Sequence, residues 1–188
     1  VLVDTPVHIE ELHEFSWDHI ERVINVLKSR FALFEEMDEI KYVQIFKNNG
    51  PMAGASISHS HWQVIGVPIV PCEQQRALLS FENYRNKNGT CLMCDMAEHE
   101  IKFGERLVFE NAGFAAFIPY AAKFSFEIWV VPKKHISSIV GMGEEEIKYL
   151  AEAIKTIISA VKDIKEDLCY NICFQDIPKG YKDEDFHW

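Results

Sequence analysis

An internal repeat constrains the fold of this chain more than any other feature of its sequence. The segment TPVHI around His8 resembles PKKHI around His135, and each precedes an amphipathic helix, an acidic turn and a strand. The step from His8 to His135 is 127 positions, and the step from His59 to His187 is 128 positions. Histidines at matched offsets on both sides of two similar helices indicate a duplication.

The two copies predict the same coarse order of strands around one helix. Apolar residues keep helical spacing from Ile20 to Phe34 in the first copy and from Ile147 to Val161 in the second. Strands are expected at 39–48, 106–119 (a pair that turns near 111–113), 125–131 and 166–176, and a further helix at 73–85. This order predicts an α+β fold, with an antiparallel sheet that carries its helices on one face.

A turn-like stretch, NKNGT at 86–90, predicts the boundary between the copies. We therefore expect residues 1–85 to be the C-terminal part of a first domain. Residues 86–188 are then a second domain that is truncated at its C-terminus. Two full copies need about 250 residues, so we expect these 188 residues to be part of a longer protein.

Composition and charge argue against two classes of partner. The net charge of −10 does not suit a nucleic-acid binder, which needs a basic surface. No apolar run approaches the 18 residues of a membrane span. Five cysteines with one tight pair do not suit a disulfide framework, so we expect a reducing, cytoplasmic location. The first residues resemble no signal peptide, but they also lack a starting Met, so a targeting segment further upstream stays open.

A C-x2-C pair, Cys91 and Cys94, marks a candidate metal site. Two thiolates on a turn face one ion, and His135 and His187 from later in the chain would complete a closed tetrahedral Cys2His2 zinc site. The spacing is longer than in a zinc finger. A redox pair, or two reduced cysteines in the core, are the alternatives.

The repeat predicts a second metal site that is half present. His8 and His59 occupy the positions of His135 and His187, while the matching cysteine pair would lie before the first residue of this chain. Closed sites of four protein ligands are structural, because no position is left for water or substrate.

His61 follows a turn rich in glycine and small residues, NNGPMAGAS at 48–56. Such backbone can bring its N–H groups close to phosphate oxygens. On a strand, residues 59, 61 and 63 would point to the same side, which places His61 beside a metal-bound His59 and in phase with the amide of Gln63. A neutral imidazole beside a phosphate is a nucleophile for phosphorus, and its product is a nucleotidyl-histidine. A solvated loop histidine, or a second metal-bound histidine, is the alternative.

The segment KNNGPMAGASISHSHWQ resembles the active-site segment of galactose-1-phosphate uridylyltransferases, a branch of the histidine-triad superfamily. It also resembles the related NDP-sugar phosphorylases with an S-H-S-H-x-Q form. The resemblance extends over TPVH, the C-x2-C pair and the C-terminal FHW, which is nearly the whole chain. It implies duplicated histidine-triad-like half-domains and a homodimer whose sites are completed across the interface.

The resemblance also implies a role for each site residue. His61 is the nucleophile that takes the nucleoside monophosphate, UMP in the uridylyltransferases, from an NDP-sugar. A sugar 1-phosphate or inorganic phosphate then accepts it. Gln63 contacts the transferred phosphate. The phosphate-lining positions are Asn48, Gly54 and Ser56, and the zinc ligands are His8 and His59 in one site and Cys91, Cys94, His135 and His187 in the other.

Two departures leave the acceptor open. The uridylyltransferases mostly have Pro between the two histidines, where this chain has Ser60, and a small residue where it has Trp62. One alternative is a phosphorylase or hydrolase of ADP-sugars or dinucleoside polyphosphates that uses the same histidine intermediate. The others are a zinc-stabilised nucleotide-binding module with a dead site, and a structural zinc protein that binds partners. The sequence does not decide between uridine and adenine.

Overall fold

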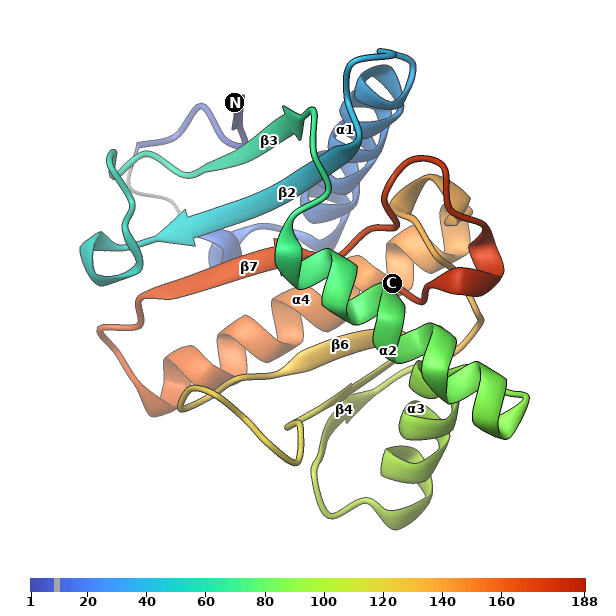
Figure 1. Cartoon of the computed structure of the whole chain (residues 1–188). Coiled ribbons are helices and arrows are strands. Elements are labelled where there is room, and N and C mark those ends of the chain that lie inside the picture. The colour runs from blue at the N-terminus through green and yellow to red at the C-terminus, as the bar shows by residue number, and fades with distance from the viewer. Residues whose placement is uncertain (9–10) are drawn as a thin grey trace.

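Figure 1 shows the chain in a computed structural model, which describes residues 1–8 and 11–188. The helices are α1 (Trp17–Glu35), α2 (Cys72–Asn88), α3 (Leu92–Phe103) and α4 (Glu144–Ile164). The strands are β1 (Leu2–Val3), β2 (Tyr42–Asn49), β3 (His61–Val67), β4 (Leu107–Glu110), β5 (Phe114–Phe117), β6 (Trp129–Pro132) and β7 (Tyr170–Phe174). Among the helices of the described ranges, none combines the length and apolarity that crossing a membrane requires.

The strands form two antiparallel sheets, which confirms the predicted α+β class. The larger sheet has the order β1-β3-β2-β7 and the smaller one β4-β5-β6. In the larger sheet β2 pairs with β7, and Ile45 lies opposite Phe174. These two strands occupy equivalent places in the two copies, so one sheet runs from the first copy into the second.

The duplication is visible in the elements themselves. Helix α1 begins at Trp17 and α4 begins at Glu144, 127 positions later. Each helix follows a 3₁₀ turn, at Leu12–Glu14 in the first copy and Ile139–Gly141 in the second, again 127 positions apart. The order of strand, 3₁₀ turn, helix and strand is therefore used twice.

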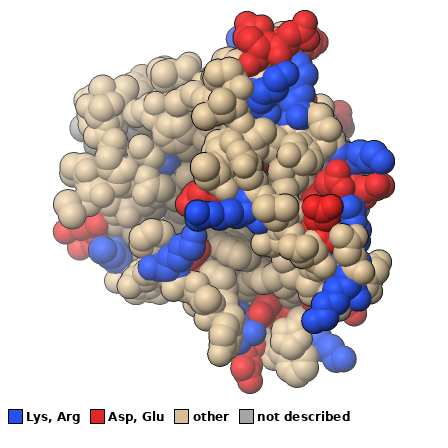
Figure 2. Space-filling model, in the orientation of Figure 1, with Lys and Arg blue, Asp and Glu red and all other residues tan. Residues whose placement is uncertain are grey.

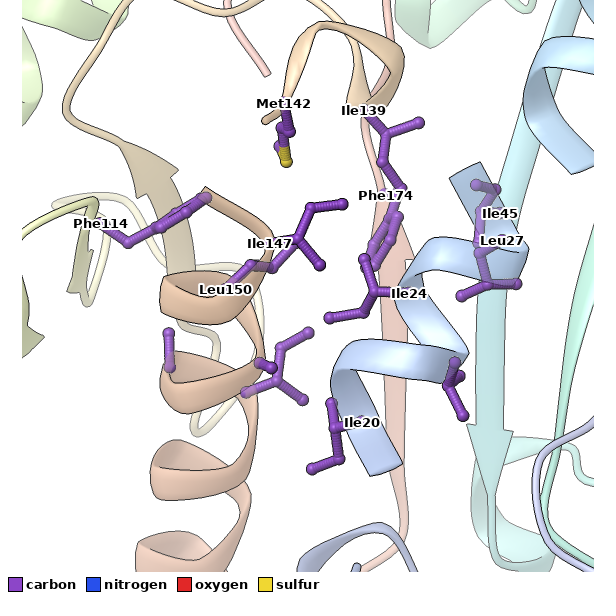
Figure 3. Close-up of a cluster of buried hydrophobic side chains, with 14 of the residues drawn as sticks. Ile20, Ile24, Leu27, Ile45, Phe114, Ile139, Met142, Ile147, Leu150 and Phe174 are labelled. Carbon is purple, nitrogen blue, oxygen red and sulfur yellow. The ribbon is translucent and has the colours of Figure 1, made fainter. Parts of the chain in front are cut away.

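One apolar core lies between these two helices and the larger sheet. Figure 3 shows Ile20 and Ile24 of α1 beside Ile147 of α4, with Phe174 of β7 next to them. All four side chains are buried, and burying a side chain of this size contributes about 1.5–3 kcal/mol. Helices α1 and α4 thus cover one face of the sheet, as predicted, while Figure 1 shows α2 crossing one end of the opposite face.

The structure differs from the sequence prediction around the cysteine pair. Helix α2 continues to Asn88 and ends at Gly89, whose φ of +78° glycine adopts without strain. A further helix, α3, follows at once, so Cys91 is its N-cap residue and Cys94 lies in its first turn rather than on an isolated turn. Of the residues of α3, only Ala97 and Glu100 are buried.

Candidate functional site

The sheet face that α1 and α4 leave free carries the predicted nucleophile. Trp62 points into the core, where it is fully buried, so its strand neighbours His61 and Gln63 point to the free face. His61 pairs with Val3 of β1 on one side. When the β2–β3 register is continued by two residues, Asn48 of β2 lies opposite His61 on the other side. Figure 2 shows this side of the molecule, whose upper left is mostly free of charged side chains.

One hydrogen bond determines the tautomer of His61. The ring is 4% exposed, and its Nδ1 donates to the backbone carbonyl of His59 over 2.8 Å. Because a carbonyl only accepts, the neutral ring carries its proton on Nδ1 and keeps a lone pair on Nε2. Since β3 begins at His61, His59 lies in the bend before the strand, and it positions His61 through its carbonyl oxygen rather than through a shared strand face.

The turn before His61 packs closely against the side chain of Cys169. Gly50 has a φ of +83°, and a Cβ there would lie 2.4 Å from the Sγ of Cys169. Gly54 has a φ of +79° and ends a short 3₁₀ turn, Pro51–Ala53, while Ser56 is exposed in the bend that follows. The predicted phosphate-lining residues therefore lie on the turn and on the adjoining end of β2.

Asn171 of β7 is a residue of this region that the sequence analysis missed. Its Nδ2 donates to Oδ1 of Asn48 over 2.7 Å and to the carbonyl of Ala53 over 2.9 Å. It thereby ties the turn to the second copy. No sequence signal pointed to it, because the contact depends on β2 pairing with β7.

The four predicted metal ligands of the second copy come together. The ligand atoms of Cys91, Cys94, His135 and His187 all lie within 4.8 Å of one another. The Sγ of Cys94 is 3.5 Å from Nδ1 of His135 and 3.3 Å from Nδ1 of His187. Residues from α3, the segment after β6 and the end of the chain thus form one cluster that can hold a metal ion.

Hydrogen bonds orient both imidazoles of this cluster. Nε2 of His135 donates to the carbonyl of Asp183, and Nε2 of His187 donates to the carbonyl of Pro132, each over 2.9 Å. Each Nδ1 lone pair is then free to face the sulfurs, which is the arrangement of histidines that bind metal.

The pKa values in this cluster fit a cation. Burial and the neighbouring Cys91 raise the pKa of the Cys94 thiol to about 12, and burial lowers the pKa of His187 to about 4. The site thus keeps His187 neutral, as a metal ligand must be, and makes an uncompensated thiolate costly. A bound divalent cation offsets that cost directly, and two sulfurs with two imidazoles are a donor set that suits zinc.

His8 and His59 form a second, smaller pair. Their Nδ1 atoms are 3.4 Å apart, and Nε2 of His59 donates to the carbonyl of Thr5 over 2.7 Å. Thr5 lies 127 positions before Pro132, so this hydrogen bond repeats the one made by His187. The two copies therefore orient their equivalent histidines in the same way.

Comparison with known proteins agrees with this arrangement. The profile described as "Galactose-1-phosphate uridyl transferase, C-terminal domain" matches residues 77–186, and one described as "Domain of unknown function (DUF4931) N-terminal domain" matches residues 1–70. An ADP-glucose phosphorylase of Arabidopsis thaliana is 30% identical over 178 residues, which are 95% of this chain and 49% of that protein. A galactose-1-phosphate uridylyltransferase of Thermotoga maritima is 28% identical over 184 residues, 97% of this chain and 57% of that protein.

The solved structures give the same result. The crystal structure of an ADP-glucose phosphorylase from Arabidopsis thaliana with bound ADP-glucose superposes with a TM-score of 0.90 at 28% identity, over 99% of this chain and 59% of that one. This chain spans about half the length of the curated relatives it matches. The family profile matches more than half of the chain and includes the Cys91–Cys94 pair. The chain belongs to the galactose-1-phosphate uridylyltransferase family.

Proposed function

We propose that the full-length protein is a nucleotidyltransferase that moves a nucleoside monophosphate from an NDP-sugar to a sugar 1-phosphate. Our first candidate for this nucleoside monophosphate is UMP. The hydrogen bond from Nδ1 of His61 to the His59 carbonyl carries this proposal, because it leaves the Nε2 lone pair free to attack phosphorus. The galactose-1-phosphate uridylyltransferases among the relatives support the choice of substrates.

The reaction proceeds in two displacements. In the first, the Nε2 lone pair of His61 attacks the α-phosphorus, an N–P bond forms, and the bond from that phosphorus to the bridging oxygen breaks. The electron pair leaves with the sugar 1-phosphate, while the proton stays on Nδ1, which donates its hydrogen bond to the His59 carbonyl. In the second, a phosphate oxygen of the acceptor attacks phosphorus, the N–P bond breaks and neutral His61 is restored.

The residues around His61 bind and orient the phosphate. We assign the Gln63 amide to a hydrogen bond with the transferred phosphate, and Asn48, Gly54 and Ser56 to the lining of the phosphate site. Donors that are already in place stabilise the charge that develops on phosphorus at no cost of reorganisation. The hydrogen bond from Asn171 to Asn48 supports this role, because it holds the side-chain amide of Asn48 next to the turn that precedes His61.

Zinc has a structural role in this proposal. Cys91, Cys94, His135 and His187 would hold one ion, and His8 and His59 would supply half of the ligands for another. Each ion would hold segments that are distant in sequence. We propose a division into residues 1–85 and 86–188. The two profile matches, at 1–70 and 77–186, also divide the chain in two, and the second begins nine residues before our boundary. A cytoplasmic homodimer stays a prediction.

ADP-sugar phosphorolysis is the second candidate function. The Arabidopsis ADP-glucose phosphorylase aligns with 95% of the chain. Ser60 between the two histidines also matches the form found in NDP-sugar phosphorylases rather than the Pro of most uridylyltransferases. In this case the intermediate would be adenylyl-His61, and inorganic phosphate would be the acceptor.

Half-reaction exchange tests the proposed function. Labelled glucose 1-phosphate is incubated with the full-length protein and either UDP-glucose or ADP-glucose, with no other acceptor present. We expect label to enter UDP-glucose, or ADP-glucose if the second candidate is correct. Exchange into neither, from a folded protein, would contradict both and favour a dead binding module.

A further inference from the structure

A buried lysine lies directly behind the proposed nucleophile. Lys47 is on β2 at a position whose alternation with Val43 and Ile45 directs it into the core, and it is fully buried. Its Nζ donates to Oδ2 of Asp4 over 2.9 Å and to Oγ of Ser60 over 2.7 Å. A third contact, of 3.2 Å, reaches the carbonyl oxygen of His61.

This ion pair is costly for the fold. Both side chains are inaccessible to solvent, and burial lowers the pKa of Lys47 against the opposing effect of Asp4. Replacing a buried ion pair by apolar residues of similar volume is often neutral or stabilising. A stability role alone therefore gives a weak reason for this pair.

The second copy shows that the fold does not require the pair. The positions that correspond to Asp4, Lys47 and Ser60 are occupied by Val131, Gln175 and Trp188. Val131 and Trp188 are both buried apolar residues. The charged network is thus confined to the copy that carries His61.

The network holds the backbone that sets the geometry of His61. Lys47 joins Asp4, which follows β1, to the Ser60 hydroxyl and the His61 carbonyl, one on each side of the Ser60–His61 peptide. The N–H of Asp4 donates to the carbonyl of that peptide, at Ser60, over 3.3 Å. That peptide lies between the His59 carbonyl and the ring that donates to it. Its orientation therefore determines whether the Nδ1 hydrogen bond can form.

We propose that Lys47 is a positioning residue for nucleotidyl transfer, acting through its contacts with the Ser60 hydroxyl and the His61 carbonyl. With Asp4 and Ser60 it keeps the His61 ring in the orientation and tautomer that present Nε2 to phosphorus. This inference rests on the proposed function of His61. It assigns no substrate contact to Lys47, so substrate binding is independent of it while the covalent step depends on it.

The test uses the double variant Lys47→Met/Asp4→Asn in the full-length protein, which removes both charges and leaves neither unpaired. Single-turnover formation of the nucleotidyl-enzyme is followed by acid-free quench and intact mass over a range of UDP-glucose and ADP-glucose concentrations. We expect the maximal rate to fall by about 10- to 100-fold, the cost of a small misplacement of a reacting group. The half-saturating concentration should stay within about twofold, because the phosphate contacts are intact.

The matched control is Arg106→Met/Glu100→Gln. It removes another ion pair, which joins α3 to the start of β4, far along the chain from His61. We expect it to leave the maximal rate unchanged. An unchanged maximal rate in the Lys47 double variant, or an equal fall in the control, would overturn the proposal.

Two further measurements keep the test decisive. If the double variant does not fold, Ser60→Ala removes one acceptor of Nζ and leaves the ion pair in place; a maximal rate equal to that of the wild type would then contradict the positioning role. If the wild-type protein forms no adduct with either sugar nucleotide, the proposed function itself fails, which is distinct from an adduct that forms at the same rate without Lys47.

Discussion

At the scale of single residues, backbone carbonyls decide the chemistry of the histidines. Four histidines each donate a hydrogen bond from one ring N–H to a backbone carbonyl oxygen, which leaves the lone pair on the other ring nitrogen. They are His59, His61, His135 and His187. The sequence predicted which residue types would be ligands and which would be the nucleophile. It could not predict their tautomers, because three of the four carbonyls lie 48 to 55 residues away.

Asp176 gives a prediction at the same scale. It is fully buried, accepts from the N–H of Ile139 over 2.7 Å, and burial raises its pKa from 3.8 to about 7. Between those two pH values the unfolded chain is ionised while the folded protein holds the proton, so the contribution of this carboxyl to stability becomes less favourable as pH rises. Asp176→Asn does not titrate, and its stability relative to wild type should rise by about 2 kcal/mol between pH 5 and pH 8.

Urea unfolding of both proteins at the two pH values measures this difference, and the comparison cancels groups that titrate in both. Parallel changes in the two proteins would show that Asp176 is ionised in the folded state throughout.

At the scale of elements, the two helices that form the core were predicted and one helix near the metal cluster was missed. Helices α1 and α4 each bury a full stripe, from Ile20 to Phe31 and from Ile147 to Ile157, and both were predicted. Helix α3 was missed because the Cys91–Cys94 pair was interpreted as lying on a turn, although Met93, Ala97 and Ile101 lie at helical spacing. The start of β3 was also unpredictable, since the turn before it is set by contacts with β7.

The turn at Gly50 gives an element-scale prediction. Gly50→Ala combines a φ of +83° with a Cβ that would meet Cys169, whereas Gly180→Ala has a φ of +93° with nothing within 4 Å. Left-handed backbone strain costs about 1–3 kcal/mol in either variant, and only the first adds a steric clash. We expect the free energy of unfolding to fall further in Gly50→Ala, as measured by urea titration. Equal losses would mean that Cys169 does not pack against this turn.

At the scale of the whole molecule, the duplication was predictable and its assembly was not. Matched offsets of 127 and 128 positions predicted two similar halves. Nothing in the sequence indicated that β2 of one half would pair with β7 of the other. That pairing brings Asn171 to Asn48, and both halves therefore contribute strands to the free face of the sheet.

Metal removal tests how the segments of the second copy are held together. The cluster of Cys91, Cys94, His135 and His187 joins α3 to two other segments, so a zinc ion there stabilises the folded state by mass action. Chelation should lower the Tm by on the order of 10 °C. Cys94→Ser should bind one zinc fewer and lose the part of the Tm decrease that chelation at this site causes. Cys72→Ser, at an exposed cysteine, should keep the zinc content and the Tm decrease of the wild type. An unchanged zinc content in Cys94→Ser would contradict the assignment of this cluster.

The intact mass of the full-length protein, mixed separately with UDP-glucose and ADP-glucose, tests the central claim most directly. We predict an adduct of one UMP or one AMP that is lost in acid and is absent from His61→Ala, with the base identifying which of the two candidate functions is correct. The variant should keep the zinc content and Tm of the wild type. An adduct that persists in His61→Ala, or no adduct from either sugar nucleotide in a folded, zinc-loaded protein, would contradict the nucleotidyl-histidine.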